Sequence, residues 1–265
     1  MMAGHRDETT AHDAPPGTWR TLPCVDDGGP ASAAAIGLLA LASDIVIEPE
    51  LRRLLPREDV GLYTHRIRIG GTLTPESLRA LEQDIPEAVA RLVPDDRIDV
   101  IAFGCTSGAM AIGPDRIAAA IRAARPQAAV TDPVTASLEA LRRLGAASIA
   151  LITPYPDDVN VVIDAYLARH APPIRARGTF RRTGDPTISR VSPRSIHDAA
   201  VALGREPVDA VFISCTALRC AGVIAQIEDV IGKPVVTSNQ ALAWHALRLA
   251  GHRTPQAGQG HLFTL

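Results

Sequence analysis

The chain contains the same strand-like segment twice, and this repeat limits the folds open to it more than any other feature. Residues 99–106 read Asp-Val-Ile-Ala-Phe-Gly-Cys-Thr and residues 209–216 read Asp-Ala-Val-Phe-Ile-Ser-Cys-Thr, so they align without a gap at an offset of 110. Residues 36–44 and 149–157 form a second aligned pair at an offset of 113. The repeat predicts two similar halves.

Short apolar runs alternate with longer helical patterns in both halves, which is typical of βαβ units with parallel strands. The predicted strands are residues 36–41, 60–69, 98–103, 128–131, 148–153, 174–182, 208–214 and 234–237. We therefore expect an α/β fold of two pseudosymmetric halves, each a four-stranded parallel sheet flanked by helices, with the active site in the cleft between them. The alternative is that buried parallel strands resemble one another without any repeat.

Helices are predicted between these strands, and the first of them has Thr74 as its N-cap and a proline in its first turn. They include residues 75–92, 135–144, 158–169, 193–203 and 240–249, and further helices are predicted after each of Cys105 and Cys215. The predicted division of the chain is a disordered tail over 1–32, a first α/β domain over 33–134 plus 238–265, and a second over 135–237. The tail lacks the apolar stretch of a secretory signal.

Cys105 and Cys215 each end an apolar strand, and ligands of open α/β sheets bind just beyond the carboxyl ends of the strands. Each cysteine precedes a threonine, small residues and a predicted helix. The N-terminus of such a helix carries partial positive charge, which lowers the pKa of a thiol and attracts carboxylates. A pseudo-twofold axis between the halves would bring the two cysteines face to face.

Two opposed cysteines can isomerise a carboxylate without a cofactor. A thiolate can take the proton beside the carboxylate while a thiol on the other face supplies one, which inverts the carbon. Alternatively, a thiolate can add to an activated double bond, allow rotation and leave, which interconverts cis and trans isomers. Both routes need donors for the developing negative charge, and Thr106, Ser107 and Thr216 are placed to supply them.

Each of these residues also has a purely structural interpretation. An isolated cysteine at a strand end is more often a small buried apolar residue than a nucleophile, so the argument depends on the duplicated Cys-Thr. Cys220, inside a predicted helix, is expected to be structural, and Cys24 lies in the tail. Tyr155 could hold a substrate carboxylate or simply pack. Asp44 and Asp157 align in the repeat and could act in the site or as helix caps.

Composition argues against several other functions. A net charge of −2 and 3% aromatic residues do not suit nucleic-acid binding, and no run of 18 apolar residues predicts a membrane span. Four cysteines in 265 residues favour free thiols in a cytoplasmic protein. No His or Asp completes a metal site with Cys215 and Cys220. Lys233, the only lysine, enters a predicted strand at the wrong end for a pyridoxal-phosphate site, so we expect no cofactor.

These features resemble the aspartate/glutamate racemase superfamily, and most of all its branch of maleate cis–trans isomerases and arylmalonate decarboxylases. The resemblance covers roughly residues 33–249 and is strongest over 212–218 and 232–244. Those stretches, with Asp44 and the Thr-Pro-Tyr155 turn, are also similar to racemase-like proteins of ectoine-utilisation operons. The resemblance implies a two-domain pseudosymmetric fold, small carboxylate or dicarboxylate substrates, and neither metal nor organic cofactor.

By position, the resemblance implies that Cys105 and Cys215 are the catalytic pair and that Tyr155 binds a substrate carboxylate. It also implies that three residues lie in oxyanion-binding turns, namely Thr106, Ser107 and Thr216. Keeping both cysteines argues against the decarboxylase branch, which retains only the second.

Ser43 and Asp44 are predicted to contact the substrate, in a Ser-Asp-Ile segment where maleate isomerases carry Ser-Asn-Thr. A carboxylate at position 44 would repel a second substrate carboxylate and could accept a hydrogen bond from an amine, amide or hydroxyl. This favours an amino-acid-like or N-acylated monocarboxylate. We expect an isomerase that forms a dimer or larger homo-oligomer. The alternatives are a decarboxylase of substituted malonates and a non-catalytic protein that binds a small ligand.

Overall fold

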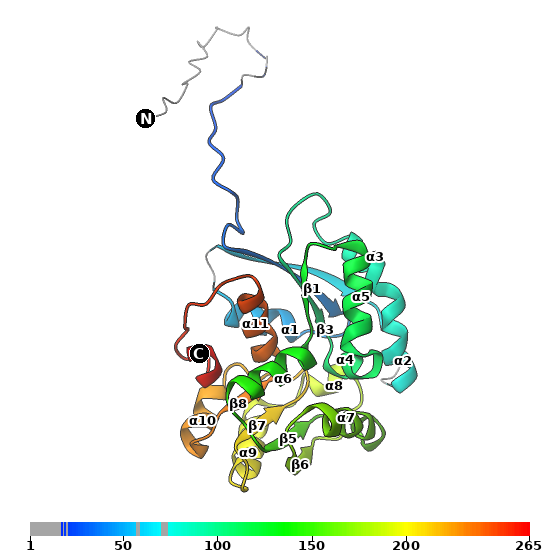
Figure 1. The fold of residues 1–265 in the computed structure, drawn as a ribbon, viewed down its shortest axis with the longest axis vertical. Coiled ribbons are helices and arrows are strands. Elements are labelled where there is room, and N and C mark those ends of the chain that lie inside the picture. Colours follow the sequence, from blue (N-terminus) through cyan, green and yellow to red (C-terminus); the bar gives the residue numbers. More distant parts are fainter. Residues whose placement is uncertain (1–16, 18, 20, 57–58, 70–73) are drawn as a thin grey trace.

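The structure, a computed structural model, describes residues 17, 19, 21–56, 59–69 and 74–265. Two α/β halves lie one above the other in Figure 1, each with its own four-stranded sheet. The strands are β1 (Ala34–Leu41), β2 (Val60–Ile67), β3 (Val100–Gly104), β4 (Ala129–Thr131), β5 (Ile149–Thr153), β6 (Ile174–Thr179), β7 (Ala210–Ile213) and β8 (Val235–Thr237). The predicted fold class is confirmed.

The two sheets have the same topology, and their equivalent pairs β1–β3 and β5–β7 have the same register. Strand order is β2-β1-β3-β4 in one sheet and β6-β5-β7-β8 in the other, and all pairs are parallel. Ile36 pairs with Val100 in the first sheet, and Ile149 pairs with Ala210 in the second. These pairs are related by the offsets of 113 and 110 read from the sequence. The aligned residues therefore occupy equivalent positions in the two sheets.

Helices cover the sheets and connect their parallel strands. They are α1 (Ile47–Leu54), α2 (Pro75–Ala80), α3 (Ile85–Ala90), α4 (Thr106–Ile112), α5 (Pro114–Ala124), α6 (Pro133–Arg143), α7 (Asp157–His170), α8 (Asp185–Ile188), α9 (Pro193–Gly204), α10 (Ile224–Ile231) and α11 (Ser238–Leu249), with 3₁₀ turns at Leu81–Asp84 and His261–Thr264. None of the described helices is both long and apolar enough to cross a bilayer.

The helix predicted over residues 75–92 is broken into two. Thr74 caps α2 as expected, since its side chain accepts a hydrogen bond from the backbone N–H of Ser77. The 3₁₀ turn Leu81–Asp84 then separates α2 from α3. Pro86, in the first turn of α3, has no N–H to donate to the preceding turn, and its ring crowds the carbonyl four residues back. A continuous α-helix through this proline is therefore disfavoured.

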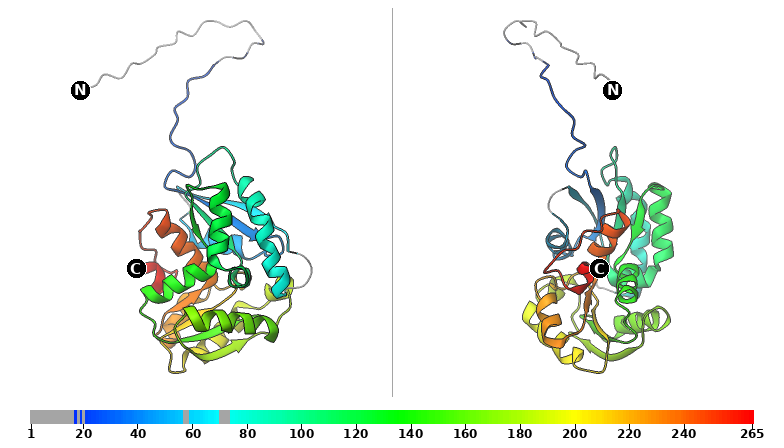
Figure 2. Two further views of the ribbon diagram at one scale, coloured as in Figure 1. Left: turned by 45° about the vertical axis from the view of Figure 1, so that its right-hand side comes forward. Right: turned by 60° about the vertical axis from the view of Figure 1, so that its left-hand side comes forward.

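The C-terminal helix α11 returns from the second sheet to the first half. It packs against α1 and α6 and also contacts β3 and β4. The two views in Figure 2 show α11 beside the first half. The division into domains over 33–134 plus 238–265 and over 135–237 stays a prediction. Most of the predicted tail lies outside the described residues, and its described part from residue 21 to 29 is exposed, without helix or strand.

Candidate active site

Cys105 and Cys215 lie at the carboxyl ends of equivalent strands. Cys105 directly follows β3, and Cys215 lies two residues beyond β7. Both side chains are buried, with 4% and 5% of their surface exposed. The structure thus places the two predicted catalytic residues at matching points of the repeat, where open α/β sheets bind ligands.

Tyr155 lies near both cysteines. It follows β5 in the second half and is buried. Its phenol makes polar contacts with the Cys215 thiol and the Ser107 hydroxyl, and the charge of either thiolate would raise the pKa of Tyr155 further above its burial-raised value. Cys105 and Ser107 belong to the first half, whereas Tyr155 and Cys215 belong to the second. One phenol therefore brings reactive groups of both halves into a single site.

Burial raises the pKa of both cysteines. The pKa of Cys105 rises to about 12 because the side chain is desolvated, even though Gly108 donates a backbone hydrogen bond to its Sγ at 3.3 Å. Burial likewise raises the pKa of Cys215 well above its ordinary value, against the opposing effect of Tyr155. The raised pKa values favour the thiol form of both residues at neutral pH. The expectation that a helix N-terminus lowers the thiol pKa is wrong for the net shift. Desolvation outweighs the effects of the Gly108 N–H and the Ser107 hydroxyl on Cys105.

The helix expected after each cysteine exists only in the first half. Cys105 is the N-cap of α4, which begins at Thr106. Residues 216–223 instead form turns, and α10 begins at Ile224. We call residues 214–223 the Cys215 loop. Cys220 lies in this loop and not in a helix as predicted, and it is buried.

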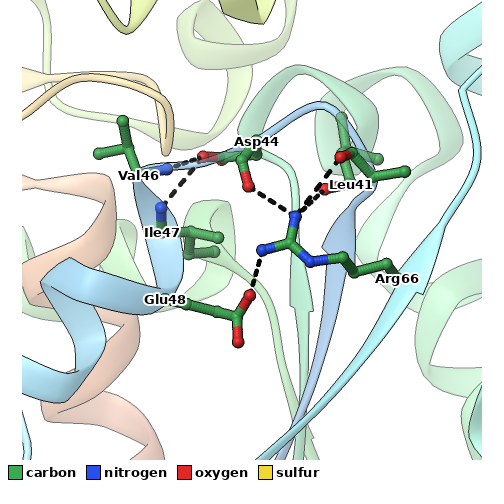
Figure 3. Close-up of polar contacts among 7 residues, drawn as sticks. Leu41, Asp44, Val46, Ile47, Glu48 and Arg66 are labelled. Atoms are coloured by element: carbon green, nitrogen blue, oxygen red, sulfur yellow. Dashed lines mark hydrogen bonds and ion pairs between the residues drawn. The ribbon is translucent and has the colours of Figure 1, made fainter.

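Asp44 is buried at the end of the segment after β1, with 1% of its surface exposed. Its Oδ1 accepts hydrogen bonds from the backbone N–H groups of Val46 at 2.8 Å and Ile47 at 3.0 Å, which start α1 (Figure 3). The Thr216 hydroxyl lies near enough to lower the pKa of this carboxyl, yet Oδ2 has no hydrogen-bond partner among the described residues. Asp44 therefore binds the first N–H groups of α1 through Oδ1, while its Oδ2 has no hydrogen-bond partner among the described residues.

Asp185 is a site residue that was not predicted from the sequence. The half-buried Ser43 donates a hydrogen bond from Oγ to Asp185 Oδ2 at 2.5 Å, so the predicted residue Ser43 joins β1 to the start of α8. The charge of Asp185 raises the pKa of Asp44, Cys105 and Cys215. An Asp before Pro at a helix start reads as ordinary capping, so no sequence signal marked it.

The three predicted charge-stabilising residues are used differently. The Thr106 hydroxyl donates to Ser238 Oγ at 2.9 Å and so ties α4 to α11. Ser107 Oγ lies 3.7 Å from Cys105 Sγ. The carbonyl of Thr216 accepts from Asn239 Nδ2 at 2.8 Å. Of the three side chains, Ser107 and Thr216 lie among the reactive groups, whereas the Thr106 hydroxyl is taken up by a structural contact.

Glu50 and Asn239 support the Cys215 loop, and neither was predicted from the sequence. Glu50 accepts hydrogen bonds from the backbone N–H of Ala221 at 2.8 Å and from Asn239 Nδ2 at 3.1 Å. The burial of Glu50 could have been noticed, because it lies on the face of α1 that also carries Ile47, Leu51 and Leu54. A carboxylate on the apolar face of an amphipathic helix needs a partner in the core.

Lys233 lies before β8 and has a structural role. Its ammonium donates hydrogen bonds to the carbonyls of Gly204 at 2.7 Å and Glu206 at 2.8 Å. Within the described ranges, no three His, Cys, Asp or Glu side chains are grouped so as to hold a metal ion. The absence of metal and of cofactor stays a prediction.

Comparison with known proteins gives consistent matches over most of the chain. A family model described as arylmalonate decarboxylase matches residues 65–263. The chain is 32% identical over 228 residues to the arylmalonate decarboxylase of Bordetella bronchiseptica, which covers 82% of this chain and 95% of that one. It is 26% identical over 238 residues to the maleate isomerase of Nocardia farcinica, and this alignment covers 86% of this chain and 94% of the isomerase.

A solved structure shares the fold. It is a serine variant of the Nocardia farcinica maleate cis–trans isomerase with a covalently bound succinylcysteine intermediate. It superimposes with a TM-score of 0.80 over 87% of this chain and 98% of that chain, at 24% identity. This likeness establishes the architecture of two four-stranded parallel sheets.

Proposed function

Because the chain belongs to the arylmalonate decarboxylase family, whose matched relatives are decarboxylases and isomerases, we propose that it is a cofactor-independent isomerase of a small carboxylate. Cys105 and Cys215 are its catalytic pair, acting on opposite sides of the substrate. The observation that carries the proposal is the contact of one buried phenol, that of Tyr155, with groups of both halves.

Two reactions fit this pair, and both conserve atoms and charge. In the first, a thiolate forms an S–H bond as the C–H bond beside the carboxylate breaks, and the electron pair moves into the carboxylate. The opposite thiol then protonates the carbon and becomes the thiolate. In the second, the thiolate forms a C–S bond to a double-bonded carbon as the π bond breaks, and the π electron pair moves into the adjacent carboxylate. After rotation about the remaining single bond, the electron pair returns, the double bond reforms and the C–S bond breaks to release the thiolate. The succinylcysteine in the Nocardia enzyme variant supports the second route for that relative.

Either reaction needs one thiol to lose its proton when substrate binds, because burial raises the pKa of both cysteines. The Gly108 N–H and the Ser107 hydroxyl favour the thiolate of Cys105. The Tyr155 phenol and the Ala217 N–H favour that of Cys215. Exclusion of water at these buried sulfurs would strengthen each such contact once the charge forms.

The proposal is tested with alanine variants of the two cysteines. Single enantiomers of 2-amino acids and N-acetyl-2-amino acids, together with maleate, are incubated with the protein in D2O and followed by NMR. We expect deuterium at the carbon beside the carboxylate, or a changed double-bond geometry. Cys105→Ala and Cys215→Ala should each lower turnover by at least ~10³-fold, as expected for residues that act as a unit.

Cys24→Ala is the matched control, because this cysteine is exposed and lies outside the site. It should keep wild-type turnover, and circular dichroism should show that all three variants are folded. Wild-type turnover in either Cys105→Ala or Cys215→Ala would contradict the two-cysteine scheme.

Decarboxylation is the second candidate, since the family model and a relative at 32% identity are arylmalonate decarboxylases. Release of carbon dioxide from phenylmalonate would favour it, and no release from a panel of substituted malonates would count against it. A substrate from ectoine utilisation, a homo-oligomeric state and a cytoplasmic location remain predictions from the sequence.

A further inference from the structure

We propose that Asp44 and Asp185 form a subsite for a substrate ammonium group, so that the substrate is an amino carboxylate and not a dicarboxylate. This inference rests on the proposed function, because the subsite adjoins the two cysteines and names the class of molecule that they act on.

The first observation is the unpartnered oxygen of Asp44. Oδ1 of this buried carboxylate is satisfied by two backbone N–H groups, but Oδ2 is buried without a hydrogen-bond partner among the described residues. Leaving a buried acceptor unsatisfied is unfavourable, and more so when it carries charge. A ligand that donates a hydrogen bond to Oδ2 would remove this penalty.

The nearby arginine does not neutralise Asp44. Arg66 donates hydrogen bonds to the carbonyl oxygens of Leu41 at 3.1 Å and of Asp44 at 2.8 Å, and it forms an ion pair with Glu48. Figure 3 shows the guanidinium directed at these groups, while the Asp44 carboxylate is directed towards Val46 and Ile47. The guanidinium of Arg66 therefore binds backbone carbonyls and Glu48, and it forms no ion pair with the Asp44 carboxylate.

Asp185 adds a second uncompensated carboxylate. It has 7% of its surface exposed, and Ser43 donates to it. Neither Asp185 nor Asp44 forms an ion pair with any Arg, Lys or His in the part of the chain that the structure describes. The two carboxylates repel each other, which contributes to the raised pKa of Asp44 after burial. A second substrate carboxylate would meet both negative charges, whereas an ammonium would be attracted by both.

The position of the pair connects substrate recognition with catalysis. The charges of Asp44 and Asp185 raise the pKa of Cys105 and also that of Cys215. An ammonium bound between the carboxylates would offset these charges and so make it easier for a thiol to lose its proton. An amino carboxylate would in this way favour the thiolate that its own reaction requires, and a dicarboxylate would disfavour it.

The repeat supplies a natural control for Asp44. Asp157 is its counterpart in the second half, but the Asp157 side chain is 74% exposed and pairs with Arg181 at 3.0 Å. An effect specific to the site should follow substitution at 44 and not at 157.

The test is isothermal titration of the full chain with three ligands that differ in one group, 2-aminobutanoate, 2-hydroxybutanoate and 2-methylbutanoate, and with maleate. We expect 2-aminobutanoate to bind at least ~10-fold more tightly than 2-methylbutanoate, and maleate to bind more weakly than 2-aminobutanoate. Asp44→Asn should abolish the preference for the amino ligand and strengthen maleate binding. Asp157→Asn should leave the order unchanged.

Asn at position 44 keeps an oxygen for the N–H groups of Val46 and Ile47, and Asp185→Asn provides a second variant should the first misfold. Equal binding of the amino and methyl ligands would overturn the subsite, and so would tighter binding of maleate than of 2-aminobutanoate. The subsite would also be overturned if the preference for the amino ligand survived in both Asn variants, or if no ligand bound. These measurements do not depend on turnover. If the cysteine variants kept full activity while the binding order held, only the proposed chemistry would fail.

Discussion

Glu50 lies on the buried face of α1 and holds the Cys215 loop through the backbone of Ala221. Its pKa is raised from 4.5 to about 7, mainly because burial disfavours the charged form. The folded protein therefore binds more protons at this residue than the unfolded chain does between these two values. Stability from Glu50 is full below pH 4.5 and is lost as the pH rises to about 7.

We predict that Glu50→Gln flattens the pH dependence of stability. Between about pH 5 and about pH 8, the wild-type free energy of unfolding should fall by roughly 2 kcal/mol more than that of the variant. Urea denaturation at both pH values measures this difference. Glu76→Gln is the control, because its side chain is 79% exposed and should behave like wild type. Equal pH slopes for Glu50→Gln and wild type would show that Glu50 titrates normally.

The sequence identifies the residues that end equivalent strands but not how buried each one is. Asp44 and Asp157 align in the repeat, yet one is buried at the cysteines and the other is on the surface. The difference arises from packing across the halves, which brings Asp185 to Ser43. For the same reason the pKa of Cys105 could not be predicted, since the sequence showed the helix N-terminus but not the desolvation.

The strands could be predicted closely, because a buried parallel strand is a continuous apolar run bounded by turns. Every predicted strand is present, with ends that differ by a few residues. The helices could be predicted less closely from the sequence than the strands. The four-residue helix α8 and the seven-residue helix α4 are too short to show a helical period, and Pro86 breaks the pattern over 75–92. The turns of the Cys215 loop depend on Glu50 and Asn239, which are distant in sequence.

The first turn of α4 positions Cys105, and Gly108 is the residue on which this geometry depends. Its N–H donates to Cys105 Sγ, and a Cβ added at Gly108 would lie 3.1 Å from that sulfur and 3.2 Å from Leu81 Cδ1. Both distances are shorter than ordinary van der Waals contact, so the sulfur would have to move. A small displacement of a reacting group can cost a large factor in rate.

We therefore predict that Gly108→Ala lowers kcat by ~10-fold or more, while the urea midpoint stays close to wild type because alanine favours helix. Gly222→Ala in the Cys215 loop is the control, since a Cβ there would make an ordinary 3.5 Å contact with Arg53. Turnover on the substrate found in the D2O panel gives the readout. An unchanged kcat in Gly108→Ala would mean that the position of Cys105 tolerates such a shift.

At the scale of the whole molecule, neither half contains the site alone. Ser43 of the first half contacts Asp185 of the second, and the phenol of Tyr155 in the second half contacts Ser107 in the first. The core residues of both halves belong to one continuous cluster. Opening one half would break these contacts and separate the catalytic pair. We therefore expect the two halves to unfold together.

Cooperative unfolding can be tested with a probe in one half and a mutation in the other. Trp244 on α11 is buried, whereas Trp19 is fully exposed and can be replaced by Phe to leave one fluorescent probe. Leu167→Ala on α7 truncates a side chain buried in the second half and should cost ~2–5 kcal/mol. We predict that the Trp244 transition in urea shifts to lower concentration together with the circular dichroism transition. Val161→Ala on the same helix, at a 68% exposed position, should leave the midpoint nearly unchanged. The opposite outcome is that Leu167→Ala leaves the Trp244 midpoint unchanged while circular dichroism shows an earlier transition. That result would mean that the halves unfold independently and that their contacts at the site are too weak to couple them.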